Sequence, residues 1–294
     1  MNNKRLSRLV QFAANSIVIL FLITTVLTQT AFAQKNSPRD IKVMTFNIRL
    51  GIVDDGENSW KHRSENLCQT IEKFNPELLG LQEAFLFQID EILKHFPDLA
   101  LVGVGRDDGK QGGEYSCILY DKTRFNVDTT ETFWFSDTPN IPGSKHWGNN
   151  ITRICTWAKF TDSKTKKRFY YYNVHLDHES QPSREKSTEL LLAKMNKQKE
   201  KLPIILTGDF NCGDDNPAIL TILKGGLVDS YRALHKKTAN DGTFHAFKGG
   251  TDGEKIDFIF TSKHLKTKKS EIVRDSYNGK FPSDHFPVIA VLEF

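Results

Sequence analysis

The sequence predicts a layered α/β fold, and three observations support this. Of the 294 residues, 38% are hydrophobic and 11% aromatic, which is enough for one large core and excludes disordered, collagen-like and disulfide-scaffold proteins. Short runs rich in β-branched and aromatic residues alternate with segments of helical periodicity. Several of these runs are apolar nearly throughout, as expected of strands that are covered on both faces.

The expected elements follow in chain order. Strands are predicted over residues 41–47, 78–82, 100–104, 116–120, 154–160, 169–175, 204–208, 256–261 and 288–292. Helices are predicted over residues 60–74, 85–96 and 184–199, where apolar residues follow the helical period. Two stretches rich in Gly, Pro and Asn, 103–114 and 133–151, are expected to be binding loops, with solvated surface connections as the alternative.

The N-terminal segment is typical of an export signal. Lys4, Arg5 and Arg8 precede an apolar run over residues 17–23, and Ala31-Phe32-Ala33 has the small-x-small form that signal peptidase accepts. We therefore expect a cleaved signal peptide (1–33), a short linker (34–40), and a single catalytic domain (41–294) in the periplasm or outside the cell. An uncleaved membrane anchor is the alternative, although the apolar run is shorter than the roughly 20 residues that a bilayer requires.

The four cysteines, Cys68, Cys117, Cys155 and Cys212, could form disulfides in an exported protein, but no spacing favours one pairing. Cys117 and Cys155 lie in apolar strand-like runs, where a cysteine is more often a small core residue. None shows the Cys-x-x-Cys spacing of a zinc site.

Polar residues end the apolar runs throughout the chain. They are Asn47, Glu83, His175, Asp209 with Asn211, Asp257, and the pair Asp284-His285. Taken singly, such residues are usually turn formers. Ligands of open α/β sheets, however, bind outside the carboxyl ends of the strands, and several carboxylates gathered there require a compensating cation. Hard oxygen ligands without thiolates indicate Mg²⁺, with Mn²⁺ as a substitute, so the sequence predicts a divalent-metal hydrolytic site.

The ordered motifs resemble those of the endonuclease/exonuclease/phosphatase superfamily. They are Thr-Phe-Asn-Ile-Arg (45–49), Leu-Gln-Glu (81–83), Asn-Val-His-Leu-Asp (173–177), Gly-Asp-Phe-Asn (208–211), Ile-Asp-Phe-Ile (256–259) and Ser-Asp-His-Phe-Pro-Val (283–288). The resemblance spans residues 41–294 and implies a four-layered αββα sandwich of two packed mixed β-sheets flanked by helices.

The resemblance also implies roles for the residues that match these motifs. Glu83 would bind the metal, with support from Asn47 and Asp284. Asp209 and Asn211 would position or deprotonate the attacking water and hold the phosphoryl oxygens. Such a site neutralises the ester, orients the water in line and stabilises the leaving oxygen.

Histidines complete the implied machinery. His285, oriented by Asp257, would act as a base or stabilise the transition state, and His175 would contact the phosphate and help to protonate the leaving oxygen. Three further residues are candidates for substrate binding, namely Arg153, Tyr115 and Trp147. For Arg153 a structural ion pair is the alternative, and for Tyr115 an ordinary place in a strand.

The substrate is a phosphoester whose class stays open. Removing the three cations of residues 1–33 from the 40 Lys and Arg residues leaves 37 against 36 acidic residues, a net charge of +1, which does not favour a nuclease. The Lys-rich segments 164–168 and 263–269 resemble solvated hairpin turns. A sphingomyelinase-type enzyme would bring Phe133, Trp134 and Phe135 to a membrane surface, and a catalytically dead binding module is a remote alternative. We expect a monomeric, secreted, Mg²⁺-dependent phosphodiesterase or phosphatase.

Overall fold

The computed structural model describes residues 40–294. The predicted signal peptide and linker therefore lie outside the described residues, except that Asp40 begins the first strand. Within the described part of the chain, every helix is too short or too polar to cross a bilayer.

Two six-stranded mixed sheets form the centre of the fold. The first has the order β11-β12-β1-β2-β4-β3. Its strands are β1 (Asp40–Asn47), β2 (Leu78–Gln82), β3 (Leu99–Val102), β4 (Ile118–Asp121), β11 (Lys266–Ile272) and β12 (Val288–Glu293). The second has the order β5-β6-β7-β8-β10-β9. Its strands are β5 (Phe125–Trp134), β6 (Ile154–Asp162), β7 (Arg168–His175), β8 (Ile204–Asp209), β9 (Leu227–Asp229) and β10 (Asp257–Ser262).

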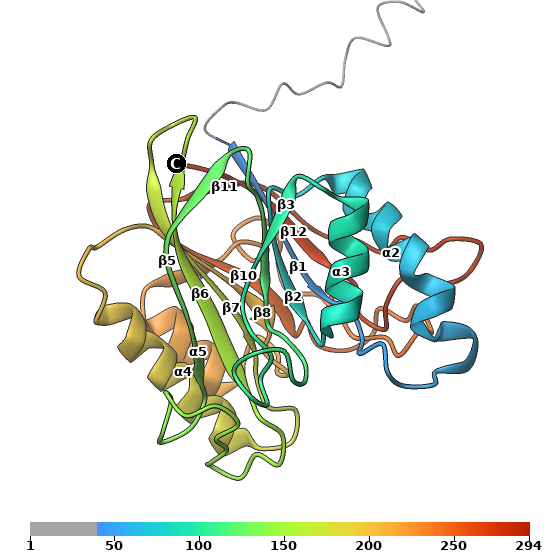
Figure 1. Ribbon diagram of the computed structural model, residues 1–294, viewed down its shortest axis with the longest axis horizontal. Coiled ribbons are helices and arrows are strands. Elements are labelled where there is room, and N and C mark those ends of the chain that lie inside the picture. Colours follow the sequence, from blue (N-terminus) through green and yellow to red (C-terminus); the bar gives the residue numbers. More distant parts are fainter. Residues whose placement is uncertain (1–39) are drawn as a thin grey trace, which may run out of the picture. The chain divides into compact units, whose positions relative to one another are not determined.

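Helices cover the outer faces of both sheets (Figure 1). They are the short 3-10 turn η1 (Gly56–Asn58) and the helices α2 (Trp60–Phe74), α3 (Leu86–His95), α4 (Gln181–Asn196) and α5 (Pro217–Lys224). One apolar cluster joins α2 and α3 to the first sheet, a second lies between the sheets, and a third joins α4 and α5 to the second sheet. These layers confirm the predicted αββα sandwich.

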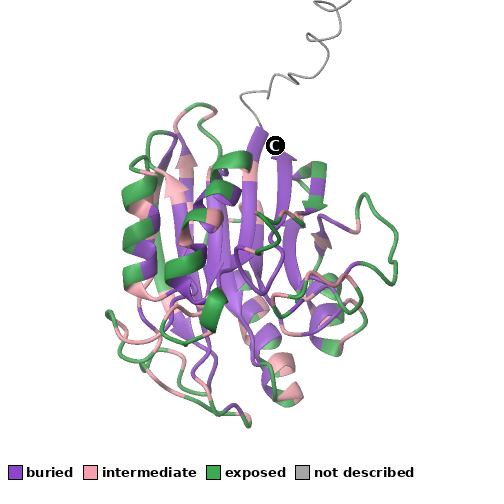
Figure 2. Ribbon diagram, turned by 90° about the vertical axis from the view of Figure 1, so that its right-hand side faces the viewer, coloured by how far each residue is buried: buried purple, intermediate pink, exposed green. Residues whose placement is uncertain are grey.

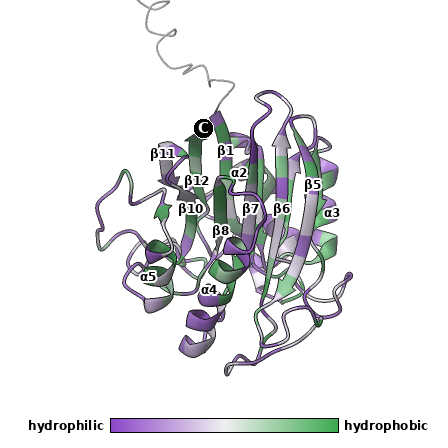
Figure 3. Cartoon of the chain, turned by 90° about the vertical axis from the view of Figure 1, so that its left-hand side faces the viewer, coloured by the Kyte–Doolittle hydropathy of each residue, from purple (hydrophilic) through white to green (hydrophobic). Residues whose placement is uncertain are grey.

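Burial follows from this layering. The central strands are buried along most of their length, whereas each helix keeps an exposed outer face (Figure 2). Among these strands, β8 and β12 are coloured hydrophobic along much of their length (Figure 3). All four cysteines are buried and free, so the disulfides that an exported location would permit are not formed.

The structure differs from the sequence-based expectation in several elements. Helix α5 and strands β5, β9 and β11 have no counterpart among the predicted elements, and the end of β5 falls in the stretch 133–151 that was predicted to be irregular. Phe133 and Phe135 are fully buried and Trp134 is 4% exposed, because they pack beneath α4 and against the neighbouring loop. They therefore provide no protruding apolar surface for a membrane.

Candidate active site

Strand register brings the polar strand ends to one edge of the two sheets. β1 and β2 run parallel, so Asn47 at the end of β1 lies beside Glu83, which directly follows β2. β7 and β8 are also parallel, and His175 pairs with Asp209. The antiparallel strand β10 begins at this edge, where Asp257 pairs with the same Asp209. Residues that are far apart in the sequence are therefore neighbours in the fold.

The segment before β12 brings Asp284 and His285 to the same place. Buried Arg63 of α2 fixes this segment, since its Nη1 donates hydrogen bonds to the carbonyl of Ile48 at 2.6 Å and to that of Pro282 at 2.9 Å. The Ser283 hydroxyl donates to the Asn47 carbonyl at 2.7 Å. The end of β1 and the start of β12 are therefore joined directly beneath the site.

The predicted residues converge on a cleft of about 500 Å³. Its polar lining consists of Arg49, Glu83, Arg106, Glu114, Arg153, His175, His178, Asp209, Asn211, Asp284 and His285, and its apolar lining of Leu50, Ile151, Phe244 and Ile256. Asn47 and Asp257 lie behind the lining and contact it. The cleft contains both acidic and cationic groups, as a site for an anionic ester with a metal requires.

Asn47 holds two of the carboxylates in place. Its amide nitrogen donates to Glu83 Oε1 at 2.9 Å and to Asp209 Oδ2 at 3.0 Å, while its oxygen accepts the backbone N–H of Arg49 at 3.0 Å. In this arrangement the Asn47 amide nitrogen positions the two carboxylates, and the amide oxygen is held by the Arg49 N–H. Glu83 itself has a left-handed backbone, with φ of 58°. This strained conformation occurs where the carboxylate leaves β2 for the cleft.

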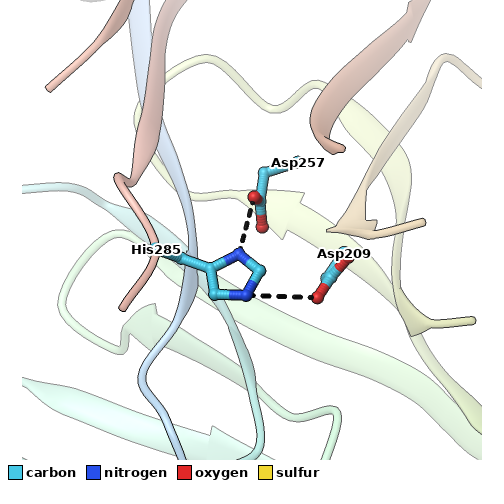
Figure 4. Close-up of side chains that lie close together, drawn as sticks. All are labelled: Asp209, Asp257 and His285. Atoms are coloured by element: carbon cyan, nitrogen blue, oxygen red, sulfur yellow. Dashed lines mark hydrogen bonds and ion pairs between the residues drawn. The ribbon is translucent and has the colours of Figure 1, made fainter. Parts of the chain in front are cut away.

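Asp209, His285 and Asp257 form a buried row (Figure 4). His285 Nδ1 lies 2.9 Å from Asp257 Oδ2, and its Nε2 lies 3.8 Å from Asp209 Oδ2. Burial opposes the imidazolium, but the carboxylates of Asp257, Asp209 and Asp284 outweigh it and raise the pKa of His285 to about 10. His285 is therefore a cation at neutral pH, with Asp257 as its orienting partner.

Two groups of side chains at the site are candidates for holding a metal ion. Asp209, Asp257 and His285 place one ligand atom each within 4.8 Å of one another. However, a doubly protonated imidazole has no lone pair for a metal. Glu83 and Asp284 fit better: both carboxylates line the cleft, and burial together with the charge of Glu83 raises the pKa of Asp284 despite the nearby His285. Such an acidic pair suits a hard divalent cation.

Burial affects the remaining catalytic candidates in opposite directions. Burial and the Asp257 carboxylate raise the pKa of Asp209 above its ordinary value. Burial and the charges of Arg153 and Arg106 hold the pKa of His175 well below its usual range, so His175 is neutral. Asn211 donates its backbone N–H to Asp209 Oδ1 at 2.8 Å and its side-chain amide to the Leu176 carbonyl at 2.9 Å. These contacts fix the direction of both side chains.

Arg153 lies in the cleft, as the sequence analysis proposed. Its side chain is 3% exposed, and its Nε is 3.3 Å from Asp177 Oδ2 while its Nη2 is 2.8 Å from His178 Nδ1. Arg153 therefore makes a structural ion pair with Asp177 and also lines the cleft. Four further residues line the cleft without a predicted role, namely Arg49, Arg106, Glu114 and Phe244. Only the position of Arg49 within the Thr-Phe-Asn-Ile-Arg motif could have indicated one of them.

Tyr115 and Trp147 do not belong to the lining of the cleft. Tyr115 is 2% exposed and its hydroxyl donates to the Lys110 carbonyl at 3.1 Å. The Trp147 indole donates to Asp137 Oδ1 at 2.8 Å, and Lys186 lies over its ring. Both side chains therefore have structural partners within their own loops, and their predicted substrate contacts have no support in this geometry.

The fold and the site define a hydrolase of phosphoester bonds, and comparisons with known proteins agree. A sequence profile described as the endonuclease/exonuclease/phosphatase family matches residues 44–285. The chain is 34% identical to a solved mannosyl-6-phosphatase of Bacteroides thetaiotaomicron VPI-5482, with a TM-score of 0.82 over 86% of this chain and all of that one. It is 36% identical to a solved family protein of Bacteroides vulgatus, with a TM-score of 0.82 over 87% and 99% of the two chains. An uncharacterized protein of Acanthamoeba polyphaga mimivirus is 30% identical over 86% of this chain and its own full length.

The chain belongs to the endonuclease/exonuclease/phosphatase family. It is therefore an enzyme of a family whose members hydrolyse phosphoester bonds and generally depend on a divalent metal.

Proposed function

We propose that the protein is a Mg²⁺-dependent phosphoesterase that uses water as its nucleophile. The observation that carries this proposal is the convergence of Glu83, Asp284, Asp209, His175 and His285 on one cleft. Glu83 and Asp284 would hold the Mg²⁺. When bound, the ion would neutralise charge on the phosphoryl group and at the attacking or leaving oxygen.

Asp209 is the group best placed to accept a proton from water. Its Oδ2 is held by Asn47 and faces His175 Nε2 at 3.6 Å and His285 Nε2 at 3.8 Å. The raised pKa of Asp209 makes its carboxylate a stronger base than an exposed aspartate. The water would thus be bound and deprotonated at Asp209 Oδ2.

The two histidines contribute differently. Charged His285 can donate a hydrogen bond from its Nε2–H to a phosphoryl oxygen and so stabilise the negative charge of the transition state. His175 is neutral and can donate a hydrogen bond without repelling the cationic neighbours. Of the two roles implied for His285, the geometry therefore favours stabilisation of the transition state over general base catalysis.

For the substrate, we propose a phosphomonoester of a small alcohol, with a sugar phosphate as the leading case. The 34% identity and full-length coverage of the mannosyl-6-phosphatase support this choice. The net charge of +1 outside residues 1–33 does not favour a polynucleotide. The burial of Phe133, Trp134 and Phe135 removes the argument for a sphingomyelinase-type surface.

A substrate panel tests the activity. Purified protein should hydrolyse mannose 6-phosphate and p-nitrophenyl phosphate with Mg²⁺, and bis-p-nitrophenyl phosphate, duplex DNA, RNA and sphingomyelin more slowly. The His285→Ala variant, prepared in parallel, controls for contaminating phosphatases. Faster cleavage of the diesters than of the monoesters would overturn the phosphomonoester assignment, and inactivity on the whole panel would overturn the phosphoesterase.

We also propose that residues 1–33 direct export. Their basic start, apolar run and Ala31-Phe32-Ala33 site support this. Expression of the full chain in a bacterial host should yield a periplasmic or extracellular product whose N-terminal sequence begins at Gln34. Recovery of the intact chain from the cell membrane would indicate an anchor instead.

A further inference from the structure

A buried arginine–carboxylate pair lines the cleft without a role in the reaction described above. Arg106 Nη1 and Nη2 donate to Glu114 Oε2 and Oε1 at 2.8 Å and 2.7 Å, and the two side chains are only 14% and 11% exposed. Arg106 Nε is buried and has no hydrogen-bond partner among residues 40–294, although Asp107 Oδ1 lies 3.9 Å from it. The pair therefore retains a free donor, and the Glu114 oxygens retain lone pairs.

Backbone hydrogen bonds hold together the loop that carries Arg106 and Glu114, without help from their side chains. The Arg106 backbone N–H donates to the Glu114 carbonyl, and Gly105 N–H donates to the Lys110 carbonyl, both at 3.0 Å. The Trp134 indole donates to the Arg106 carbonyl at 2.6 Å. The loop is thus fixed by backbone contacts, and the two side chains are presented to the cleft on a rigid support.

Arg106 and Glu114 line the same cleft as the catalytic residues, and their charges interact with those residues. The charge of Arg106 contributes to the low pKa of His175, and the charge of Glu83 acts to raise the pKa of both Arg106 and Glu114. The pair therefore lies within electrostatic range of the phosphoryl site. A carboxylate at this distance disfavours a second phosphate but accepts hydrogen bonds from hydroxyl groups.

An exposed aromatic ring also lines the cleft. Phe244 is 48% exposed and its ring lies 5.1 Å from that of His285. A cleft that is lined by both an exposed ring and hydrogen-bonding side chains can bind a sugar through its C–H face and its hydroxyls.

We propose that Arg106 and Glu114 form the subsite for the hydroxyl-bearing alcohol of the substrate, which selects phosphomonoesters of neutral polyols such as sugars. Glu114 accepts hydrogen bonds from hydroxyl groups, and Arg106 Nε donates one. The pair contributes binding and specificity, while Asp209 accepts the proton of the water and His285 stabilises the transition state. This inference rests on the proposed phosphoesterase function.

Two monoesters with and without hydroxyls test the subsite. Mannose 6-phosphate and n-hexyl phosphate carry the same phosphate, but only the first can bond to Glu114. In the Glu114→Gln variant, kcat/KM should fall for mannose 6-phosphate by about tenfold more than for n-hexyl phosphate, mainly through KM, since a charge-assisted hydrogen bond is lost. The same change at Glu200, a surface partner of Arg168 at 2.6 Å, should leave both substrates unchanged.

Equal losses on the two monoesters, or no loss on either, would overturn the subsite. Thermal unfolding checks that Glu114→Gln folds; if it does not, Glu114→Asp keeps the charge while withdrawing it from the cleft, and should show the same selective loss.

Calorimetry separates this inference from the proposed function. The His285→Ala protein with Mg²⁺ should bind mannose 6-phosphate more tightly than n-hexyl phosphate, and adding Glu114→Gln should remove the difference. If the wild-type enzyme hydrolyses neither monoester, the proposed function fails, and this binding difference still decides the subsite.

Discussion

At the scale of single residues, catalysis depends on the charge that His285 carries. The imidazole lies between Asp257 and Asp209, and these carboxylates, with Asp284, keep it protonated in spite of its burial. The cost of burying such a row is offset only while every partner is present. Changes at any member should therefore lower turnover and also reduce stability.

Removal of either reacting side chain should abolish most of the activity. Asp209→Ala and His285→Ala should each lower kcat by about a thousandfold or more, because the first removes the base and the second the donor to the phosphoryl oxygen. Steady-state kinetics with circular dichroism on the same samples measures both activity and folding. Near-complete activity in a folded variant would refute its assigned role.

Asp257 acts through His285 and should show a distinct signature. Asp257→Asn removes the charge that fixes the imidazolium, so kcat should fall by about a hundredfold and the pKa of His285, followed by NMR, should fall with it. Asp128→Asn is a matched control, because the Asp128 carboxylate also accepts a side-chain hydrogen bond, from Thr161 on the exposed edge of the second sheet. An unchanged pKa of His285 would show that Asp257 does not hold the imidazolium.

At the scale of elements, a buried polar bridge joins the two sheets below the site. Asn173 of β7 donates to the carbonyls of Leu81 and Cys117 at 2.8 Å each, and its oxygen accepts from Gln82 at 2.8 Å and from Thr207 at 2.9 Å. These bonds fix β7 and β8 against β2 and β4. They explain structurally why an asparagine stands two residues before His175.

Loss of this bridge should destabilise the whole fold. Asn173→Ala removes four buried hydrogen bonds that cross between the strands and leaves a cavity, so the free energy of unfolding should fall by about 2–5 kcal/mol. Urea denaturation measures the change. Asn126→Ala, on an exposed position of β5, should alter it by less than about 0.5 kcal/mol. Equal stability of the two variants would contradict a structural role for the bridge.

Hydropathy patterns predicted the strands that are buried on both faces, but they missed β5, β9 and β11, which are three of the four edge strands in the described residues. β1, β2, β7 and β8 are apolar runs in the sheet interior, and their bounds were predicted to within a residue or two. β11 has the sequence Lys-Thr-Lys-Lys-Ser-Glu-Ile and was assigned to a hairpin turn. It is an edge strand, where exposed lysines oppose unwanted pairing and hide the β pattern.

At the scale of the whole molecule, the charged row at the site should make stability depend on pH. The pKa of His285 is raised from 6.5 to about 10, so its contribution is fully present below about pH 6.5 and is lost as the pH rises through 10. The pKa of Asp209 is also raised, so its contribution to stability is likewise lost as the pH rises, but over a lower pH range. The metal-free protein should therefore unfold more easily at pH 9.5 than at pH 6.

Urea unfolding in EDTA, compared between wild type and His285→Gln, measures this dependence. The difference in unfolding free energy between the two proteins should shrink as the pH rises from 6 to 10. A difference that grows with pH would mean that His285 is neutral in the folded protein.

The sequence predicted which strand ends carry the site, because polar residues interrupt apolar runs there regardless of the tertiary structure. It could not predict how loops contribute. Arg106 and Glu114 lie in a Gly-rich segment without periodicity, and only the folded loop pairs them in the cleft. Conversely, Trp147 is an aromatic residue of a long loop, yet the ring packs beside Lys186 away from the cleft.

The central claim is that Glu83 and Asp284 hold a divalent cation beside the phosphoester. The most direct measurement is turnover of p-nitrophenyl phosphate as a function of Mg²⁺ concentration after EDTA treatment, in the wild type and in Glu83→Gln. We expect no turnover without metal, recovery with Mg²⁺ or Mn²⁺, and a Mg²⁺ requirement at least about tenfold higher in Glu83→Gln. Full activity of the wild type in EDTA, or an unchanged Mg²⁺ requirement in the variant, would contradict it.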